Sequence, residues 1–157
     1  MSSRNENIQT KIALMNATKK LKQLSYLEFI KFEEYDSYWL QLFDSELRRF
    51  RKINSIPTYS KSYENNKGNI VWLENSLDSF ENKKEWLILV INYPLPVWAN
   101  VRVLNYTGAL EELWESSDYH ELIIADKSTG RIAQVFSEED SYEIHIGKCD
   151  IANSRGD

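Results

Sequence analysis

Cysteine, histidine and glycine are scarce in this sequence, and each scarcity excludes a class of site. The single cysteine, Cys149, has no partner for a disulfide within the chain, so the fold depends on its own core. Cys149, His120 and His145 show none of the spacings typical of zinc sites, and we expect no bound metal. The five glycines lie too far apart for a phosphate-binding loop or a dinucleotide fingerprint, so we expect no cofactor.

Long hydrophobic segments are also missing. The longest apolar run covers only residues 86–91, whereas a helix that crosses a bilayer needs about 20 apolar residues. Residues 1–7 contain no apolar stretch of the kind found in secretory signals. We therefore expect a cytoplasmic protein with no membrane partner.

No catalytic signature is present, and we expect a protein that is not an enzyme. The sequence has no G-x-S-x-G motif, and Cys149 has no recognisable base nearby. The adjacent acids of residues 111–112 and 138–140 are typical of solvated runs rather than of carboxylates held apart in a cleft. The alternative is a small hydrolase or nuclease in which His120 and His145 share a pocket with nearby acids or Arg102.

Negative charge is concentrated in the second part of the chain. The formal net charge is −5, with +4 in residues 1–67 and −9 in residues 68–157. An acidic region binds nucleic acid poorly but suits a basic protein, although acids can also serve solubility alone. The basic run at residues 48–52 is short, and we interpret it as a solvated helix end rather than a nucleic-acid site.

Helical periodicity marks the front of the chain. Apolar residues recur at helical spacing over residues 8–24 and 36–52, and Asp36 or Ser37 is suited to cap the second helix. Residues 54–69 are rich in turn-forming residues and predict an exposed loop. This loop would separate a helical front, residues 8–52, from a β-rich back.

Strand patterns dominate the back, residues 69–146. A short helix capped by Thr107 interrupts them, and Gly130 closes the turn of a hairpin. We expect a frayed tail over residues 147–157. The expected strands are residues 69–74, 85–92, 97–104, 120–125, 131–136 and 142–146.

The clustering of strands predicts a single-domain α+β fold over residues 1–157. The sheet would be mainly antiparallel, with five or six strands, and the N-terminal helices would pack on one face. A chain of this length buries enough surface for a core of its own, and its 13% aromatic content favours such a core.

Acids and aromatic residues are interleaved within residues 98–143, and we predict that they form a partner-binding surface. Aromatic side chains supply anchors at interfaces, and charges steer the approach of a partner. Trp114 and Tyr142 lie in the same stretch, but we expect them in the core. The predicted surface residues are Trp98, Glu111, Glu112, Glu115, Asp118, Tyr119, Glu121, Glu138, Glu139, Asp140 and Glu143.

The same region resembles small bacterial immunity proteins, which accompany polymorphic toxins and toxins of contact-dependent growth inhibition. The resemblance covers residues 85–146, from the run Glu-Trp-Leu-Ile-Leu-Val-Ile at residues 85–91 to Tyr-Glu-Ile-His at residues 142–145. It implies a protein that binds and neutralises one cognate toxin, and acidity implies that the toxin is a basic nuclease. A further alternative is a regulatory or oligomerising domain with residues 8–24 as a detachable partner helix.

Overall fold

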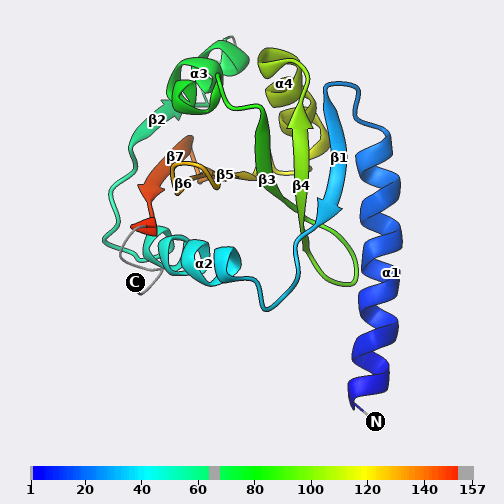
Figure 1. Ribbon diagram of the computed structural model, residues 1–157. Coiled ribbons are helices and arrows are strands. Elements are labelled where there is room, and N and C mark those ends of the chain that lie inside the picture. The colour runs from blue at the N-terminus through cyan, green and yellow to red at the C-terminus, as the bar shows by residue number, and fades with distance from the viewer. Residues whose placement is uncertain (1, 64–67, 152–157) are drawn as a thin grey trace.

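A computed structural model describes residues 2–63 and 68–151 of the chain, with side chains described from residue 7 onward. It contains one antiparallel sheet in the order β1-β4-β3-β5-β6-β7-β2, flanked by helices (Figure 1). The predicted α+β fold is confirmed, with seven strands rather than five or six. The elements are α1 (Ser2–Lys22), β1 (Leu27–Phe32), α2 (Tyr38–Phe50), β2 (Tyr59–Ser62), α3 (Asn69–Ser76), the 3-10 helix η1 (Asp78–Phe80), β3 (Glu85–Val90), β4 (Val97–Val103), α4 (Tyr106–Ser116), β5 (Leu122–Asp126), β6 (Arg131–Ser137) and β7 (Ser141–Lys148).

The strands that we did not predict, β1 and β2, form the two edges of the sheet. β1 has a single fully buried side chain, Leu27, and β2 has none. Edge strands of this kind are defined by backbone pairing with β4 and β7, so they carry little hydrophobic pattern. The prediction of a loop over residues 54–69 was wrong where it covers β2.

The short strand predicted over residues 69–74 is also wrong, because these residues form most of α3. The β-branched and aromatic residues there favoured a strand. The buried side chains Leu73, Ser76 and Leu77 instead recur at helical spacing. The chain enters the helix through Gly68, whose φ of 76° is readily adopted only by glycine.

Helices cover both faces of the sheet, so the expectation of one covered face was wrong. On the first face, α1, α3 and α4 pack against alternate strand residues such as Ile88, Val101 and Ile124. On the second face, α2 packs against Leu87 and Ile123 and the residues beside them. The segment between β1 and α2 passes around one end of the sheet, which carries α2 to the opposite side (Figure 1).

The N-terminal helix docks on the sheet beside β1 and β4. Its side chains Ala13, Ala17 and Leu21 are buried in the core of the first face. On the outer side of the helix, Ile12 and Met15 remain exposed, and the N-terminal end extends past the strands (Figure 1). No helix in the described part of the chain is both long enough and apolar enough to cross a membrane.

Local capping differs from the prediction at one helix. Ser37 caps α2, as expected, by accepting a hydrogen bond from the Trp39 N–H. α4 is capped by Asn105, whose side-chain oxygen accepts from the Gly108 N–H at 2.7 Å. The hydroxyl of Thr107 donates instead to Glu74 of α3, so Thr107 links two helices.

The β5–β6 hairpin is confirmed, and its turn also orders the end of the chain. Gly130 has the expected positive φ, 80°, and its carbonyl accepts a hydrogen bond from the Cys149 N–H at 2.8 Å. β7 therefore runs to Lys148, and Cys149 is buried, so the predicted fraying does not begin at Gly147. Residues 152–157 of the predicted tail lie outside the described part of the chain.

Candidate protein-binding surface

An acidic turn joins β6 to β7. Glu138, Glu139 and Asp140 are exposed there, and Glu143 follows on the second face of β7. Within residues 2–63 and 68–151, none of these four carboxylates forms an ion pair. Burial raises the pKa of Glu143, and the Glu138 and Asp140 carboxylates raise that pKa further. The turn therefore concentrates negative charge that no described residue neutralises through an ion pair.

Tyr63, the residue that follows β2, holds this turn in place. Its N–H donates to the Asp140 carbonyl at 3.1 Å, and its hydroxyl donates to the Glu138 carbonyl. The Tyr63 ring packs edge-on against Tyr142, with the ring centroids 4.5 Å apart. Because these hydrogen bonds hold the backbone at Glu138 and at Asp140, the positions from which the acidic side chains extend are fixed.

Tyr119 lies next to the acidic turn and is 74% exposed. The Ser137 hydroxyl donates to the Tyr119 carbonyl, which joins the loop after α4 to the end of β6. The neighbouring His120 anchors the same loop, since its ring stacks on Trp114 at a centroid distance of 4.2 Å. We define the acidic surface as Asp118, Tyr119, Glu138, Glu139, Asp140 and Glu143.

Other predicted residues lie elsewhere or have other partners. Both carboxylate oxygens of Glu112 accept backbone N–H groups, those of Ser25 and Tyr26, each at 2.7 Å. Glu112 therefore ties α4 to the start of β1. Trp98 is half-buried in β4, which β3, β5 and β6 separate from β7, so it does not join the acidic surface.

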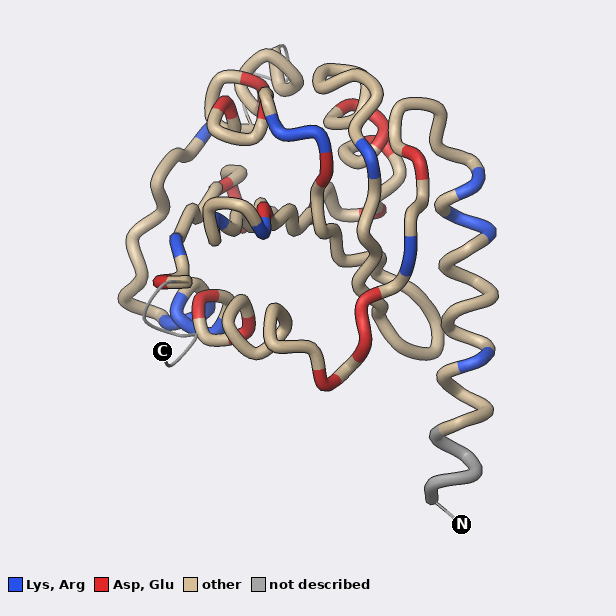
Figure 2. The backbone as a smooth tube through the Cα atoms, viewed as in Figure 1, with Lys and Arg blue, Asp and Glu red and all other residues tan. Residues whose placement is uncertain are grey.

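The remaining predicted acids lie on or just after α4. Glu111 and Glu115 are exposed on the helix, where Figure 2 shows acidic segments, and Glu121 is half-buried ahead of β5. Trp114 and Tyr142 pack against each other in the core of the first face at a centroid distance of 4.8 Å. The predicted core position is confirmed for Trp114, whereas Tyr142 is half-buried and packs against the core.

The two histidines lie on opposite faces of the sheet. His120 packs with Trp114 and Tyr142 on the first face. His145 packs between Phe50 and Phe136 on the second face. A hydrolase or nuclease built on both histidines needs a shared pocket, and the structure does not bring the two rings together. The described residues also contain no cluster of side chains suited to hold a metal ion.

The basic run at the end of α2 has partners within the same helix. Arg48 pairs with Asp44 at 2.8 Å, and Arg49 pairs with Glu46 at 2.6 Å. Both pairs join residues one turn apart, and both arginines are exposed, although Glu46 is half-buried. This placement agrees with the interpretation of residues 48–52 as a solvated helix end.

The structure contains a buried polar cluster that was not predicted from the sequence. The Glu33 carboxylate accepts hydrogen bonds from Ser37, from Asn100 at 2.9 Å and from Lys127 at 2.7 Å. Burial on its own would raise the pKa of Glu33, but these hydrogen bonds and the Lys127 charge outweigh it and lower the pKa. No pattern in the sequence links these four residues, because they come from three segments that are distant in the chain and meet only in the folded protein.

The cluster joins the segment before α2 to β4 and to the β5–β6 turn. Beside it, the Asp126 carboxylate accepts from Ser128 at 2.8 Å and from Thr129 at 2.6 Å. A cavity of about 280 Å³ lies next to these groups. Since Glu33 and Asp126 are both fully engaged with the chain's own donors, we assign this region a structural role.

No family model, no curated protein and no solved structure matches this chain.

Proposed function

We propose that this chain is a non-enzymatic protein that binds a basic protein partner through the acidic surface. The observation that carries the proposal is the cluster of carboxylates at residues 138–143, which has no counter-ion within the described part of the chain. Burial raises the pKa of Glu143, and repulsion from the nearby Glu138 and Asp140 carboxylates raises it further. A partner that brings Lys or Arg to this turn relieves the repulsion between the carboxylates. This relief makes the free energy of binding more favourable.

The arrangement also suits recognition in its shape. Tyr119 offers a large exposed ring next to the charges, and aromatic side chains of this kind are common anchors at interfaces. Tyr63 and Ser137 fix the backbone on either side, so little conformational entropy is lost when a partner binds. The acids then provide electrostatic steering toward a basic surface.

We further propose that the partner is a bacterial toxin that this protein neutralises, as the resemblance to immunity proteins implies. A nuclease toxin suits the charge of the surface, because a nuclease attracts phosphate with Lys and Arg. The acidic surface would occupy that basic site in place of the nucleic acid. Inhibition would be stoichiometric and would need no chemistry from this chain.

Co-purification tests the proposal. The tagged chain is expressed together with the product of the adjacent gene, and the captured proteins are identified by mass spectrometry. We expect one basic protein in a one-to-one complex. The double variant Glu138→Lys/Glu139→Lys should lose that protein.

A matched control separates this surface from a general effect of charge. Glu34 and Asp36 are exposed acids in the segment between β1 and α2, which lies apart from the β6–β7 turn (Figure 2). The double variant Glu34→Lys/Asp36→Lys changes the net charge by the same amount and should retain the partner. Equal capture by both variants, or capture of no basic protein by the wild type, would refute the proposal.

A further inference from the structure

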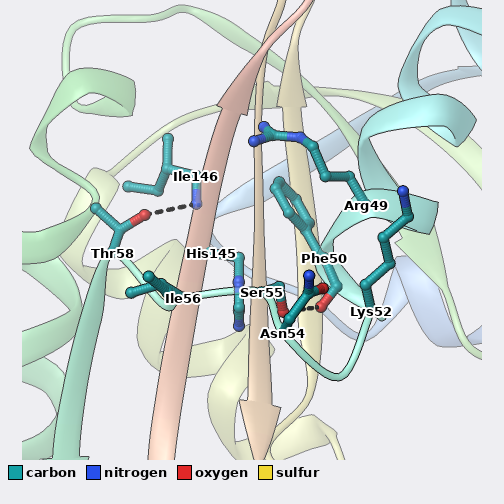
Figure 3. A pocket seen from close by; sticks show the side chains of 9 residues that line it. All are labelled: Arg49, Phe50, Lys52, Asn54, Ser55, Ile56, Thr58, His145 and Ile146. Carbon is teal, nitrogen blue, oxygen red and sulfur yellow. Dashed lines mark hydrogen bonds between the residues drawn. The ribbon is translucent and has the colours of Figure 1, made fainter.

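A second feature of the molecule, separate from the acidic surface, is a cavity of about 300 Å³ on the second face of the sheet. It lies between the C-terminal end of α2, the segment that follows this helix, and β7 (Figure 3). Its size falls at the lower end of the range known for small-molecule sites. The described side chains that line it include two cations, Arg49 and Lys52, and no carboxylate.

His145 lines this cavity and is only 5% exposed. Its ring is held between Phe50 and Phe136, with centroid distances of 5.4 Å and 5.2 Å. Neither ring nitrogen forms a hydrogen bond with any described residue of the chain. The ring nitrogens are not among the fully buried polar atoms of the described residues, so they are accessible to a molecule in the cavity.

The protonation state of His145 follows from its surroundings. Burial lowers its pKa, Glu138 raises it, and Arg49 lowers it, with a net decrease. The ring is therefore neutral near pH 7 and offers one donor and one acceptor. This combination suits a hydroxyl, amide or protonated acid group of a ligand.

Gln134 lies next to His145 in the sheet, although it does not line the cavity. It is the partner of His145 across the β6–β7 ladder, so both side chains lie on the second face of the sheet. The side-chain oxygen of Gln134 is buried and has no hydrogen-bond partner.

The cavity beside the Glu33 cluster is of similar size but differs in its polar groups. There the carboxylates accept hydrogen bonds from other residues of the chain.

The entrance is basic and its geometry is fixed. Arg49 is oriented by Glu46, which accepts from its Nε at 2.8 Å and from its Nη2 at 2.6 Å. This pair rests on Gly147, where an added Cβ would lie 2.8 Å from atoms of both side chains. No described residue accepts a hydrogen bond from Arg49 Nη1 or forms an ion pair with Lys52.

Hydrogen bonds also fix the segment that forms the outer wall. The Ser55 hydroxyl donates to the Phe50 carbonyl at 2.8 Å, and the Ile146 N–H donates to the Thr58 hydroxyl at 3.0 Å (Figure 3). These bonds attach the segment to α2 at one end and to β7 at the other. The cavity is therefore preformed rather than dependent on a ligand for its shape.

We propose that this cavity binds a small organic anion, whose carboxylate or phosphate contacts Arg49 and Lys52 and whose body lies against Phe50 and His145. Arg and Lys are the side chains that bind such anions most strongly. The aromatic ring of Phe50 and the aliphatic side chain of Ile56 provide an apolar wall for the body of the ligand. A nitrogen of His145 would bond a polar group at the inner end.

Nuclear magnetic resonance titration of the full, isotope-labelled chain tests this inference, with phenyl phosphate and benzoate as probes. We expect saturable shifts of the His145 ring signals and of the Ile146 amide with at least one probe. A response to phenyl phosphate alone would identify a phosphate site, and a response to benzoate alone a carboxylate site. Lys52→Gln should weaken binding by about tenfold, since it removes a charge-assisted contact.

Arg51 supplies the matched control, because it is the exposed neighbour of Lys52 but does not line the cavity. Arg51→Gln should bind the probe within about twofold of the wild type, since an exposed charge that does not contact the ligand is screened by salt. The inference is overturned if neither probe shifts His145 saturably up to about 10 mM, well above a millimolar dissociation constant. Equal weakening by the two variants, or an equal response to uncharged phenol, would also overturn it.

Discussion

His120 adopts a backbone conformation that few residues other than glycine adopt, with a φ of 55°. The stack on Trp114 and the 2.9 Å contact between its Nδ1 and the Trp114 carbonyl hold it there. His120→Ala keeps the strained backbone but loses both contacts. We expect it to lower the free energy of unfolding by about 2 kcal/mol in urea denaturation.

His120→Gly provides the comparison, because glycine adopts this conformation without strain. It should lower the free energy of unfolding less than His120→Ala does. If His120→Ala unfolds at the same urea concentration as the wild type, the anchoring role of His120 is incorrect. Loss of the anchor should also weaken binding of the basic partner, since the backbone of Tyr119 would no longer be fixed.

The pKa of Glu143 predicts how stability depends on pH. Burial and its acidic neighbours raise this pKa in the folded protein, so the folded state holds the Glu143 proton more tightly than the unfolded state. The contribution to stability is therefore present below the unfolded pKa and is lost as the pH rises through the folded pKa. Glu143→Gln should raise Tm near pH 7, and the difference should shrink near pH 4. A lower Tm for Glu143→Gln near pH 7 would contradict the account.

Cys149 should be unreactive in the folded protein. Burial, together with the Glu46 carboxylate, raises the pKa of its thiol to about 11, and its Sγ lies 3.4 Å from the Leu42 carbonyl. The thiolate is the reactive form, so alkylation by iodoacetamide near pH 8 should be slow in native protein and fast in urea. Equal rates in the two states, measured by mass spectrometry, would show that this end of the chain is open.

At the scale of elements, α1 is an integral part of the core. Ala13 and Ala17 are fully buried and Leu21 is 4% exposed, so a chain without residues 1–25 would leave the first face of the sheet uncovered. We expect that truncated chain to lose cooperative thermal unfolding and to aggregate. The control Met15→Gln changes an exposed position of the same helix and should unfold within about 0.5 kcal/mol of the wild type. A soluble, cooperatively folded truncated chain would favour the detachable-helix alternative.

The elements that sequence reasoning predicted are those with a strong hydrophobic pattern. β3, β5, β6 and β7 bury several side chains each, and their apolar residues are visible as runs or alternations. β2 buries none, so nothing in its composition distinguishes it from a loop. α3 was mistaken for a strand because the propensity of its β-branched residues opposed its burial pattern, and packing against α4 decided the outcome.

The candidate sites show the same division. The acids of the β6–β7 turn are adjacent in sequence, and their exposure follows from the turn itself. Tyr63 is distant in sequence, so its contribution to the acidic surface depends on the pairing of β2 with β7. The cavity at His145 was not predicted, because the end of α2 closes over β7 only after the chain passes around the sheet. Sites made within one turn are visible in a sequence, whereas sites made between distant elements depend on the tertiary fold.

At the scale of the whole molecule, charge is segregated. The described side chains of α1 include four lysines and no acid, and this helix lies beside β1 and β4. The acidic surface lies at the β6–β7 turn, toward the opposite edge of the sheet (Figure 2). Such segregation produces a field that orients an approaching charged partner. Association of the two proteins should therefore be fast at low salt and should slow as salt screens the charges.

The salt dependence of the association rate tests the central claim most directly. The rate is measured by stopped flow with the co-purified basic partner, for the wild type and for the two charge-reversed double variants. We predict that Glu138→Lys/Glu139→Lys lowers the rate by about tenfold or more at low salt and flattens its salt dependence. We predict that Glu34→Lys/Asp36→Lys leaves the association rate and its salt dependence close to those of the wild type. Equal rates and equal salt dependence for the two variants would show that the acidic surface is not where the partner binds.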